Sequence, residues 1–135
     1  MELTYLLDAT VLVTLLRNRA DAMRPRLRAA TGRMAVSTVS VAELEHGVAR
    51  SAAPDHDGER VESLLSLLTI LPFDRAAAHH AGRISAQLVR AGTPIGPYDV
   101  LIAGHARSRG LVVVTNNLRE FARVPGLECE DWLDA

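Results

Sequence analysis

The chain has 135 residues, of which 48% are hydrophobic and 23% are charged, and its formal net charge is -1. This length and balance indicate one globular domain with a sizeable hydrophobic core. The small net charge excludes a protein that coats nucleic acid through bulk positive charge.

Cysteine usage and hydropathy limit the cellular context. Cys129 is the only cysteine, so no disulfide can form within the chain and a reducing compartment is expected. The N-terminus lacks a basic segment, and Asp8 interrupts its apolar run, which argues against a signal peptide. No stretch approaches the ~20 apolar residues of a membrane span. We expect a cytoplasmic protein without a membrane partner.

The first apolar stretch, residues 3–7, predicts a strand that is buried on both faces. From Val11 onward the apolar spacing changes to that of an amphipathic helix. Asp8 lies between the two, at the carboxyl end of the strand, where open α/β sheets bind ligands. It is either the N-cap of the helix or a functional group, and its position alone does not decide between them.

An arginine-rich segment follows the first helix. Six arginines lie between Arg17 and Arg33, against the single acid Asp21, and Met23, Leu27 and Ala30 predict a short second helix there. A run of charge is usually a solvated helix face. The alternative is a basic wall beside the crevice that holds a polyanion, because arginine makes bidentate phosphate contacts.

A second acid lies at the start of the next predicted helix. Residues 34–36 predict a short buried strand, after which Ser40 is expected to be an N-cap and Glu43 its capping-box partner three residues on. Glu43 therefore has a purely structural interpretation when it is considered alone.

The middle of the chain continues the alternation. A helix over 59–68, a buried strand over 70–73 and a helix over 75–91 are predicted, with Asp74 as N-cap and Gly92 as the end of the last helix. The adjacent histidines 79 and 80 point to different faces of that helix, so they do not predict a metal pair.

The third acid, Asp99, opens a helix that runs to Ser108 and is apolar nearly all round, which predicts a buried helix. Gly110 ends it, a β-branched strand over 111–114 follows, and the turn 115–117 comes at the carboxyl end of that strand. Trp132 is expected to anchor the C-terminal tail.

Strands that alternate with helices in this way predict an α/β sandwich with a mainly parallel sheet. Asp8, Ser37 and Thr115 then follow three strands at the same edge of the sheet. Glu43 and Asp99 open helices that face the same crevice, so three acids converge there.

The chemistry of these residues favours a metal-dependent hydrolase. The sequence has no G-x-G-x-x-G, P-loop or G-x-S-x-G pattern and no zinc-type cluster of cysteine and histidine. Carboxylates are hard oxygen ligands that suit Mg²⁺ or Mn²⁺. Such an ion acidifies a bound water and neutralises charge on a phosphodiester, so the acids predict phosphodiester hydrolysis.

Five stretches also match a known family, in the family's order and over nearly the whole chain: LLDATVLVTLLR, VSTVSVAELEHGVARS, ILPFDRAAA, AGTPIGPYDVLIAGHARSRG and VVTNNLREFARVPGL. On these residues the chain resembles the PIN-domain ribonucleases, specifically the VapC-type toxins of bacterial toxin–antitoxin pairs. It is most similar to the group that cuts the anticodon loop of initiator tRNA.

The resemblance implies a fold and partners. It implies a three-layer α/β/α sandwich formed by a single PIN domain over residues 1–135. It also implies a homodimer, a tRNA substrate, and a VapB-type antitoxin whose C-terminal segment fills the crevice.

The resemblance also assigns residues. It implies that Asp8, Glu43 and Asp99 are the catalytic acids that bind Mg²⁺ or Mn²⁺. It implies a fourth site position in or near the TNN turn, left open among Asn116, Asn117 and Glu120. If RNA is the substrate, the arginine-rich segment becomes a candidate grip on its phosphates, with Arg17 and Arg19 as the first residues to test.

One departure from the family lies beside the first acid. Where the family usually has Asp-Thr-Asn, this chain has Asp8-Ala9-Thr10, so a hydroxyl would replace an amide in holding the site. This departure and the amides of the TNN turn leave open a catalytically weakened or silent PIN-like module that binds RNA or metal. A phosphate-transfer receiver domain would need a lysine at the site, and the chain has none.

Overall fold

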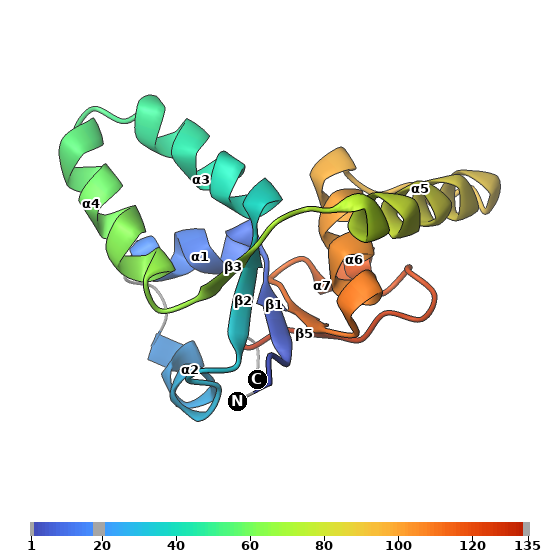
Figure 1. Cartoon of the computed structure of the whole chain (residues 1–135), viewed down its shortest axis with the longest axis horizontal. Helices are drawn as coiled ribbons and strands as arrows, with labels where there is room; N and C mark the ends of the chain where they lie inside the picture. The colour runs from blue at the N-terminus through green and yellow to red at the C-terminus, as the bar shows by residue number, and fades with distance from the viewer. Residues whose placement is uncertain (1, 18–20, 134–135) are drawn as a thin grey trace.

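A computed structural model describes residues 2–17 and 21–133 of the chain, so Arg19 lies outside the described residues. Its centre is one five-stranded sheet in the order β3-β2-β1-β4-β5, and every neighbouring pair is parallel (Figure 1). The strands are β1 (Tyr5–Leu7), β2 (Met34–Ser37), β3 (Thr69–Leu71), β4 (Val112–Val114) and β5 (Cys129–Glu130).

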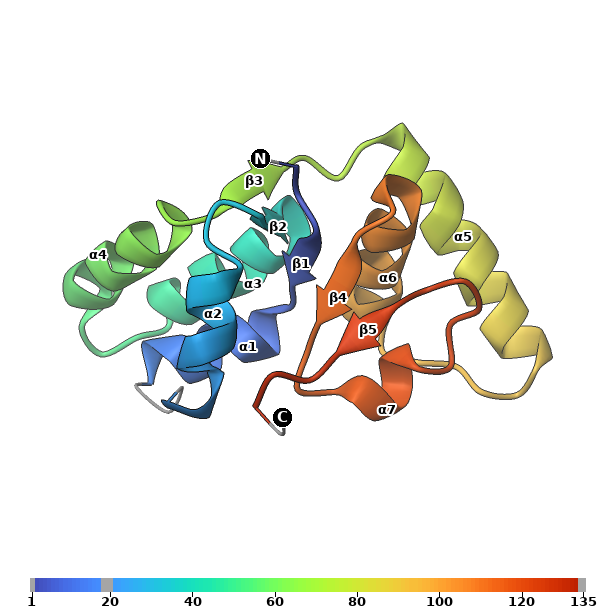
Figure 2. The same cartoon turned by 90° about the horizontal axis from the view of Figure 1, so that it is seen from below.

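Helices cover both faces of this sheet. They are α1 (Ala9–Leu16), the 3₁₀ turn η1 (Asp21–Met23), α2 (Arg24–Ala29), α3 (Thr38–Ala49), α4 (Pro54–Leu65), α5 (Arg75–Arg90), α6 (Pro97–Arg109) and α7 (Leu118–Phe121). Helices α1–α4 lie on one side and α5–α7 on the other (Figure 2). The predicted three-layer α/β/α sandwich is confirmed. No helix of the described residues is long and apolar enough to cross a membrane.

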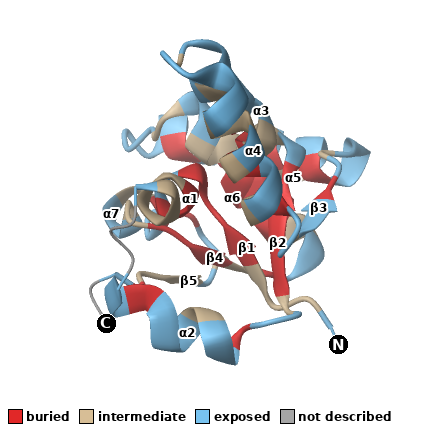
Figure 3. Ribbon diagram, turned by 90° about the vertical axis from the view of Figure 1, so that its left-hand side faces the viewer, coloured by how far each residue is buried: buried red, intermediate tan, exposed pale blue. Residues whose placement is uncertain are grey.

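The central strand β1 divides the core in two. Leu6 and Leu7 are both fully buried, but Leu6 belongs to the core beneath α5 and α6, and Leu7 to the core beneath α1, α3 and α4. Successive side chains of a strand point to opposite faces, so β1 supplies both layers. Burial is concentrated on the strands, and the outer faces of the helices are exposed (Figure 3).

Two sequence predictions differ from the structure in this region. The strand predicted over 70–73 is β3, and its Ile70 is 45% exposed rather than buried, because β3 is an edge strand with one neighbour. The helix predicted from residue 59 begins at Pro54. A proline in the first turn needs no N–H partner, and Asp55 and Asp57 favour the positive end of the helix dipole.

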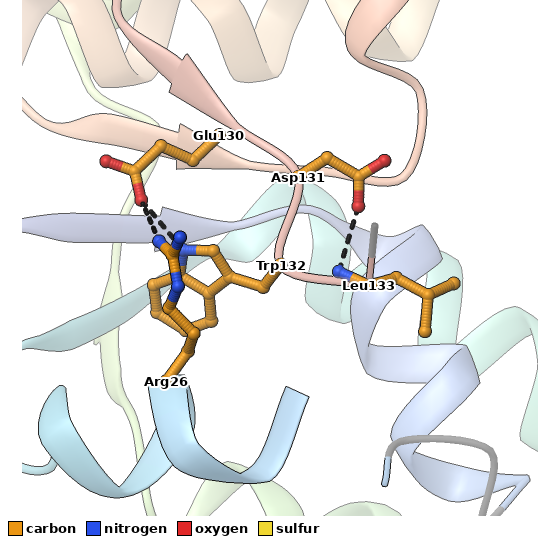
Figure 4. Close-up of polar contacts among 5 residues, drawn as sticks. All are labelled: Arg26, Glu130, Asp131, Trp132 and Leu133. Atoms are coloured by element: carbon orange, nitrogen blue, oxygen red, sulfur yellow. Dashed lines mark hydrogen bonds and ion pairs between the residues drawn. The ribbon is translucent and has the colours of Figure 1, made fainter. Parts of the chain in front are cut away.

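The C-terminal tail is held by α2, as Figure 4 shows. The carboxylate of Glu130 accepts from Arg26 Nη1 at 3.1 Å and from Trp132 Nε1 at 2.8 Å. Trp132 is 1% exposed and meets the Tyr5 ring edge-on, with centroids 5.0 Å apart. Trp132 therefore anchors the tail as predicted, and Arg26 uses its charge in an internal contact.

Helices α5 and α6 approach each other most closely at Gly104. A Cβ atom added there would lie 2.5 Å from the backbone N of Ala81 and 2.6 Å from its Cα. Because backbone atoms cannot give way as a side-chain tip can, only glycine allows this spacing.

We predict that Gly104→Ala lowers the free energy of unfolding by about 1–3 kcal/mol through overpacking. The matched control is Gly82→Ala in α5, where an added Cβ meets nothing within 4 Å. That control should stabilise the helix by up to about 1 kcal/mol. Urea unfolding of both variants measures the difference, and equal stabilities would contradict the close approach.

Candidate active site

The first acid of the site, Asp8, lies where the central strand β1 meets α1, and it is only 3% exposed. Its Oδ1 accepts from the backbone N of Ala9 at 2.7 Å and so caps α1. Its Oδ2 accepts from Thr10 Oγ1 at 3.1 Å and from Thr115 Oγ1 at 2.9 Å. Burial raises the pKa of Asp8, against the lowering effect of these hydrogen bonds. The helix cap therefore uses only Oδ1, and Oδ2 is bound by the two threonine hydroxyls instead.

The prediction that Ser40 caps α3 is wrong. Ser37 at the end of β2 is the N-cap, because its Oγ accepts from Val39 N at 3.1 Å, and the helix begins at Thr38. Glu43 thus lies in the second turn, beyond the reach of a capping box. Glu43 is therefore not the capping-box partner that the sequence alone allowed.

Glu43 is half-buried and lines a cavity of about 280 Å³ between α1, α3 and α4, together with Arg17 and Arg60. Burial, and then the negative charge of Asp8, raise the pKa of Glu43. The carboxylates of Asp8 and Glu43, which come from different elements, are therefore close enough for the charge of one to shift the pKa of the other.

The third acid, Asp99, is in the first turn of α6, but Gly96 is the N-cap and has no side chain to cap with. Asn117 Nδ2 donates to Asp99 Oδ2 at 3.0 Å and to Glu120 Oε2 at 2.7 Å. Asp99 and Glu120 are also hydrogen-bonded to each other.

These contacts shift the pKa values of Asp99 and Glu120 in opposite directions. Burial raises the pKa of Asp99 to about 7, and the hydrogen bond to Glu120 and the charges of Asp8 and Glu120 act in the same direction. Hydrogen bonds from Asp99 and Asn117 lower the pKa of Glu120. The two carboxyl groups therefore share a hydrogen-bonded proton, which Asp99 binds at a higher pH than Glu120 does.

The two asparagines of the TNN turn face different ways. Asn117 contacts the acids, whereas Asn116 Nδ2 donates to Thr14 Oγ1 at 3.0 Å and the backbone N of Asn116 donates to Thr10 Oγ1 at 3.3 Å. Thr10 therefore links Asp8 to this turn. Of the three candidates for the fourth position, Asn117 and Glu120 lie with Asp99, and Asn116 lies against α1.

Sequence reasoning missed two features of the site. Thr115, fully buried, holds Asp8; the only signal for it was a hydroxyl directly after a strand. His105 Nδ1 lies 2.8 Å from Ser37 Oγ, and both residues are buried. This contact joins the start of α3, which carries Glu43, to α6, which carries Asp99.

The arginines of the predicted basic wall are largely engaged elsewhere. Arg24 pairs with Asp21 at 2.9 Å, Arg26 with Glu130, and Arg33 Nη2 donates to Thr4 Oγ1 at 2.8 Å. Arg17 is exposed. Among the described residues, no arginine forms an ion pair with Asp8, Glu43 or Asp99.

A divalent cation fits this site by donor type and charge. Carboxylate and amide oxygens suit Mg²⁺ and Mn²⁺. Burial is the main cause of the raised pKa values of Asp8, Glu43 and Asp99, and the charge of Asp8 adds to it at Glu43 and Asp99. A cation bound beside these carboxylates would favour their charged forms. Within residues 2–17 and 21–133, however, no three acidic, histidine or cysteine side chains already form a cluster that could hold a metal. The side chains would have to close around an ion.

Comparisons with known proteins identify the family of the chain. The PIN domain family matches residues 5–127. The tRNA(fMet)-specific endonuclease VapC of Salmonella typhimurium is 48% identical over 96% of this chain and 98% of its own, and that of Shigella flexneri is 44% identical over the same shares. The DNA-bound VapBC structure from Salmonella typhimurium superposes with a TM-score of 0.93 at 48% identity, over 96% of this chain and 98% of that one.

The VapBC2 structure from Rickettsia felis, bound to a promoter DNA fragment, has a TM-score of 0.90 at 30% identity and covers 98% of this chain and 99% of that one. The chain therefore belongs to the PIN-domain family, as a VapC-type ribonuclease.

We predict that the free energy of unfolding without metal falls as pH rises from 3.8 to about 7, the ordinary and folded pKa values of Asp99. In this window the folded state binds more protons than the unfolded state, so raising the pH favours unfolding. The raised pKa values of Asp8 and Glu43 add to the same slope. The lowered pKa of Glu120 acts with the opposite sign, below its ordinary value of 4.5.

Asp99→Asn should flatten this slope, and Glu45→Gln, an exposed acid in the middle of α3, is the control. Urea unfolding across the window in EDTA measures both variants. An unchanged slope in Asp99→Asn would contradict the shared proton.

Proposed function

We propose that this chain is a metal-dependent endoribonuclease toxin that hydrolyses RNA phosphodiester bonds. The observation that carries the proposal is the set Asp8, Glu43 and Asp99. These acids come from three separate elements, and the charge of Asp8 acts on both of the others without a neutralising arginine among the described residues. Relatives named tRNA(fMet)-specific endonuclease support the anticodon loop of initiator tRNA as the substrate.

In this proposal Asp8, Glu43 and Asp99 hold Mg²⁺ or Mn²⁺. When bound, the ion supplies Lewis acidity that activates water and offsets charge on the phosphate. The chain's own groups prepare the site: Thr10 and Thr115 fix the carboxylate of Asp8. Asn117 aligns Asp99 with Glu120, so we assign the fourth position to these two residues rather than to Asn116.

The proposed partner is a VapB-type antitoxin. Solved relatives are VapBC complexes, which supports such a partner for this chain. A cluster of acids repels itself without a cation, and a basic side chain of the antitoxin could relieve that repulsion in place of the metal. The single domain over residues 1–135, the homodimer and the cytoplasmic location stay predictions.

The silent PIN-like module remains the second candidate, because Thr10 stands where the family usually has asparagine. Its hydroxyl still bonds Asp8 and accepts from the backbone N of Asn116. That retained link favours an active enzyme.

We predict that Asp8→Asn, Glu43→Gln and Asp99→Asn each abolish cleavage of tRNA, because each removes a charge that the cation needs. The matched control is Glu45→Gln, an exposed acid two residues from Glu43 on α3, which should cleave as the parent does. Cleavage should need Mg²⁺ or Mn²⁺ and stop in EDTA. Persistent cleavage in excess EDTA would falsify the metal mechanism.

We predict that Thr10→Ala lowers the cleavage rate by about 10–100-fold, the usual effect of losing a group that orients a metal ligand. Thr10→Asn should match or exceed the parent. Rates at limiting and at saturating Mn²⁺ separate metal affinity from turnover. If Thr10→Ala equals the parent at both, the hydroxyl only starts the helix. A large gain in Thr10→Asn over a nearly inert parent would instead favour the silent module.

A further inference from the structure

Charge is divided between the two flanks of the sheet. Residues 38–65, which span α3 and α4, contain six acids and two arginines. Residues 75–109, which span α5 and α6, contain five arginines and one acid, Asp99. Figure 1 shows the two helix pairs on opposite sides of the strands. The net charge of -1 therefore combines an acidic flank, α3 and α4, with a basic flank, α5 and α6.

The basic flank is hollowed. A groove of about 560 Å³ runs along α5 and reaches α6, and we call it the α5 groove. Its floor is opened by small residues at four-residue spacing, Ala78, Gly82 and Ala86. Its polar lining consists of His79, Arg83, Gln87, Arg90 and Arg107. Among the residues that the structure describes, no acid and no Phe, Tyr or Trp side chain belongs to this lining.

The positive charge of the α5 groove has no negative partner among the described residues. Arg83 Nε donates to His79 Nε2 at 3.1 Å, and Arg107 Nε donates to His80 Nδ1 at 3.1 Å. Burial, and then Arg107, His79 and Arg83, lower the pKa of His80. Because these hydrogen bonds go to imidazole nitrogens and not to carboxylates, the two arginines keep their charge available to an anion.

Two of these arginines are free to bind a ligand. Arg83 and Arg90 are exposed, and Arg83 uses only Nε. Within residues 2–17 and 21–133, the guanidinium group of Arg90 forms no ion pair. The two residues are seven positions apart on one helix, about 10 Å along its axis. Each can therefore meet a different phosphate, and guanidinium groups bind phosphate oxygens in a bidentate way.

We propose that the α5 groove binds backbone phosphates of the RNA substrate, away from the bond that is cut. The proposal rests on the proposed function only in taking RNA as the substrate. With no Phe, Tyr or Trp side chain and no acid in the described lining, the groove binds the phosphate backbone through its arginines and does not read bases. The acidic α3–α4 flank repels the same polyanion, so the charge division orients the RNA on the molecule.

The test is binding of purified tRNA in EDTA, where no cutting occurs, as a function of salt. Arg83→Ala/Arg90→Ala should reduce the slope of log K against log salt by about 2, roughly 1 for each phosphate that is no longer bound. The control Arg50→Ala/Arg75→Ala removes the same charge from exposed positions outside the groove, at the end of α3 and at the first residue of α5. The control should keep the parent slope.

Cleavage kinetics add a second measurement. With Mn²⁺, the Arg83/Arg90 double variant should raise KM for whole tRNA and leave kcat unchanged. Cleavage of a short RNA that spans only the cut site should be affected less than cleavage of whole tRNA, because the groove shares none of its lining residues with the acids of the site.

The outcomes separate the two proposals. A lowered slope in a protein that cuts no RNA supports the α5 groove and overturns the nuclease. Normal cutting with an unchanged slope, or an equal reduction of the slope in the control, overturns the groove. An altered oligomeric state or weakened antitoxin binding with an unchanged RNA slope would make the groove a protein interface and also overturns the proposal.

Discussion

The buried carboxylate of Asp8 is the constraint on which the site depends. It ends the central strand of the sheet, and it is held by the backbone of Ala9 and by two threonine hydroxyls. A carboxylate in this position is costly to ionise. Its negative charge also raises the pKa values of Glu43 and Asp99. The fold thus keeps negative charge at one edge of the sheet, which a bound cation would stabilise.

The surrounding contacts keep the acids in register with one another. Thr10 ties Asp8 to the turn after β4, and Asn117 from the same turn holds Asp99 and Glu120. Ser37 and His105 join the helices that carry Glu43 and Asp99. Asp8 and Asp99 are therefore each held by a side chain from a distant part of the chain, and the helix that carries Glu43 is tied to the helix that carries Asp99.

The division of charge over the surface adds a second level of organisation. The arginines near the N-terminus look similar in sequence to those of α5, but Arg24, Arg26 and Arg33 bond to groups of the chain itself. Arg83 and Arg90 keep their charge exposed. Two segments that both contain several arginines therefore differ in how well they can bind an external anion. The difference depends on whether an acid or a hydroxyl of the chain lies within reach of each arginine.

The sequence by itself determined the layer order, the buried central strand and the family, because these follow from local periodicity and from contiguous motifs. A continuous apolar run predicted β1, the acid at the end of that strand indicated Asp8, and acids near two helix starts indicated Glu43 and Asp99. It failed at Ser40 and Ile70. The cap depends on where the chain leaves β2, and the exposure of β3 depends on its place at the sheet edge.

Only the tertiary structure decided how the remaining groups are arranged. Thr115 bonds Asp8 across 107 positions of the chain, and His105 bonds Ser37 across 68. Such pairings arise from how parallel strands and helices pack, and no local pattern encodes them. The same is true of the turn at 115–117: two identical asparagines follow each other, and only packing turns one to α1 and the other to the acids.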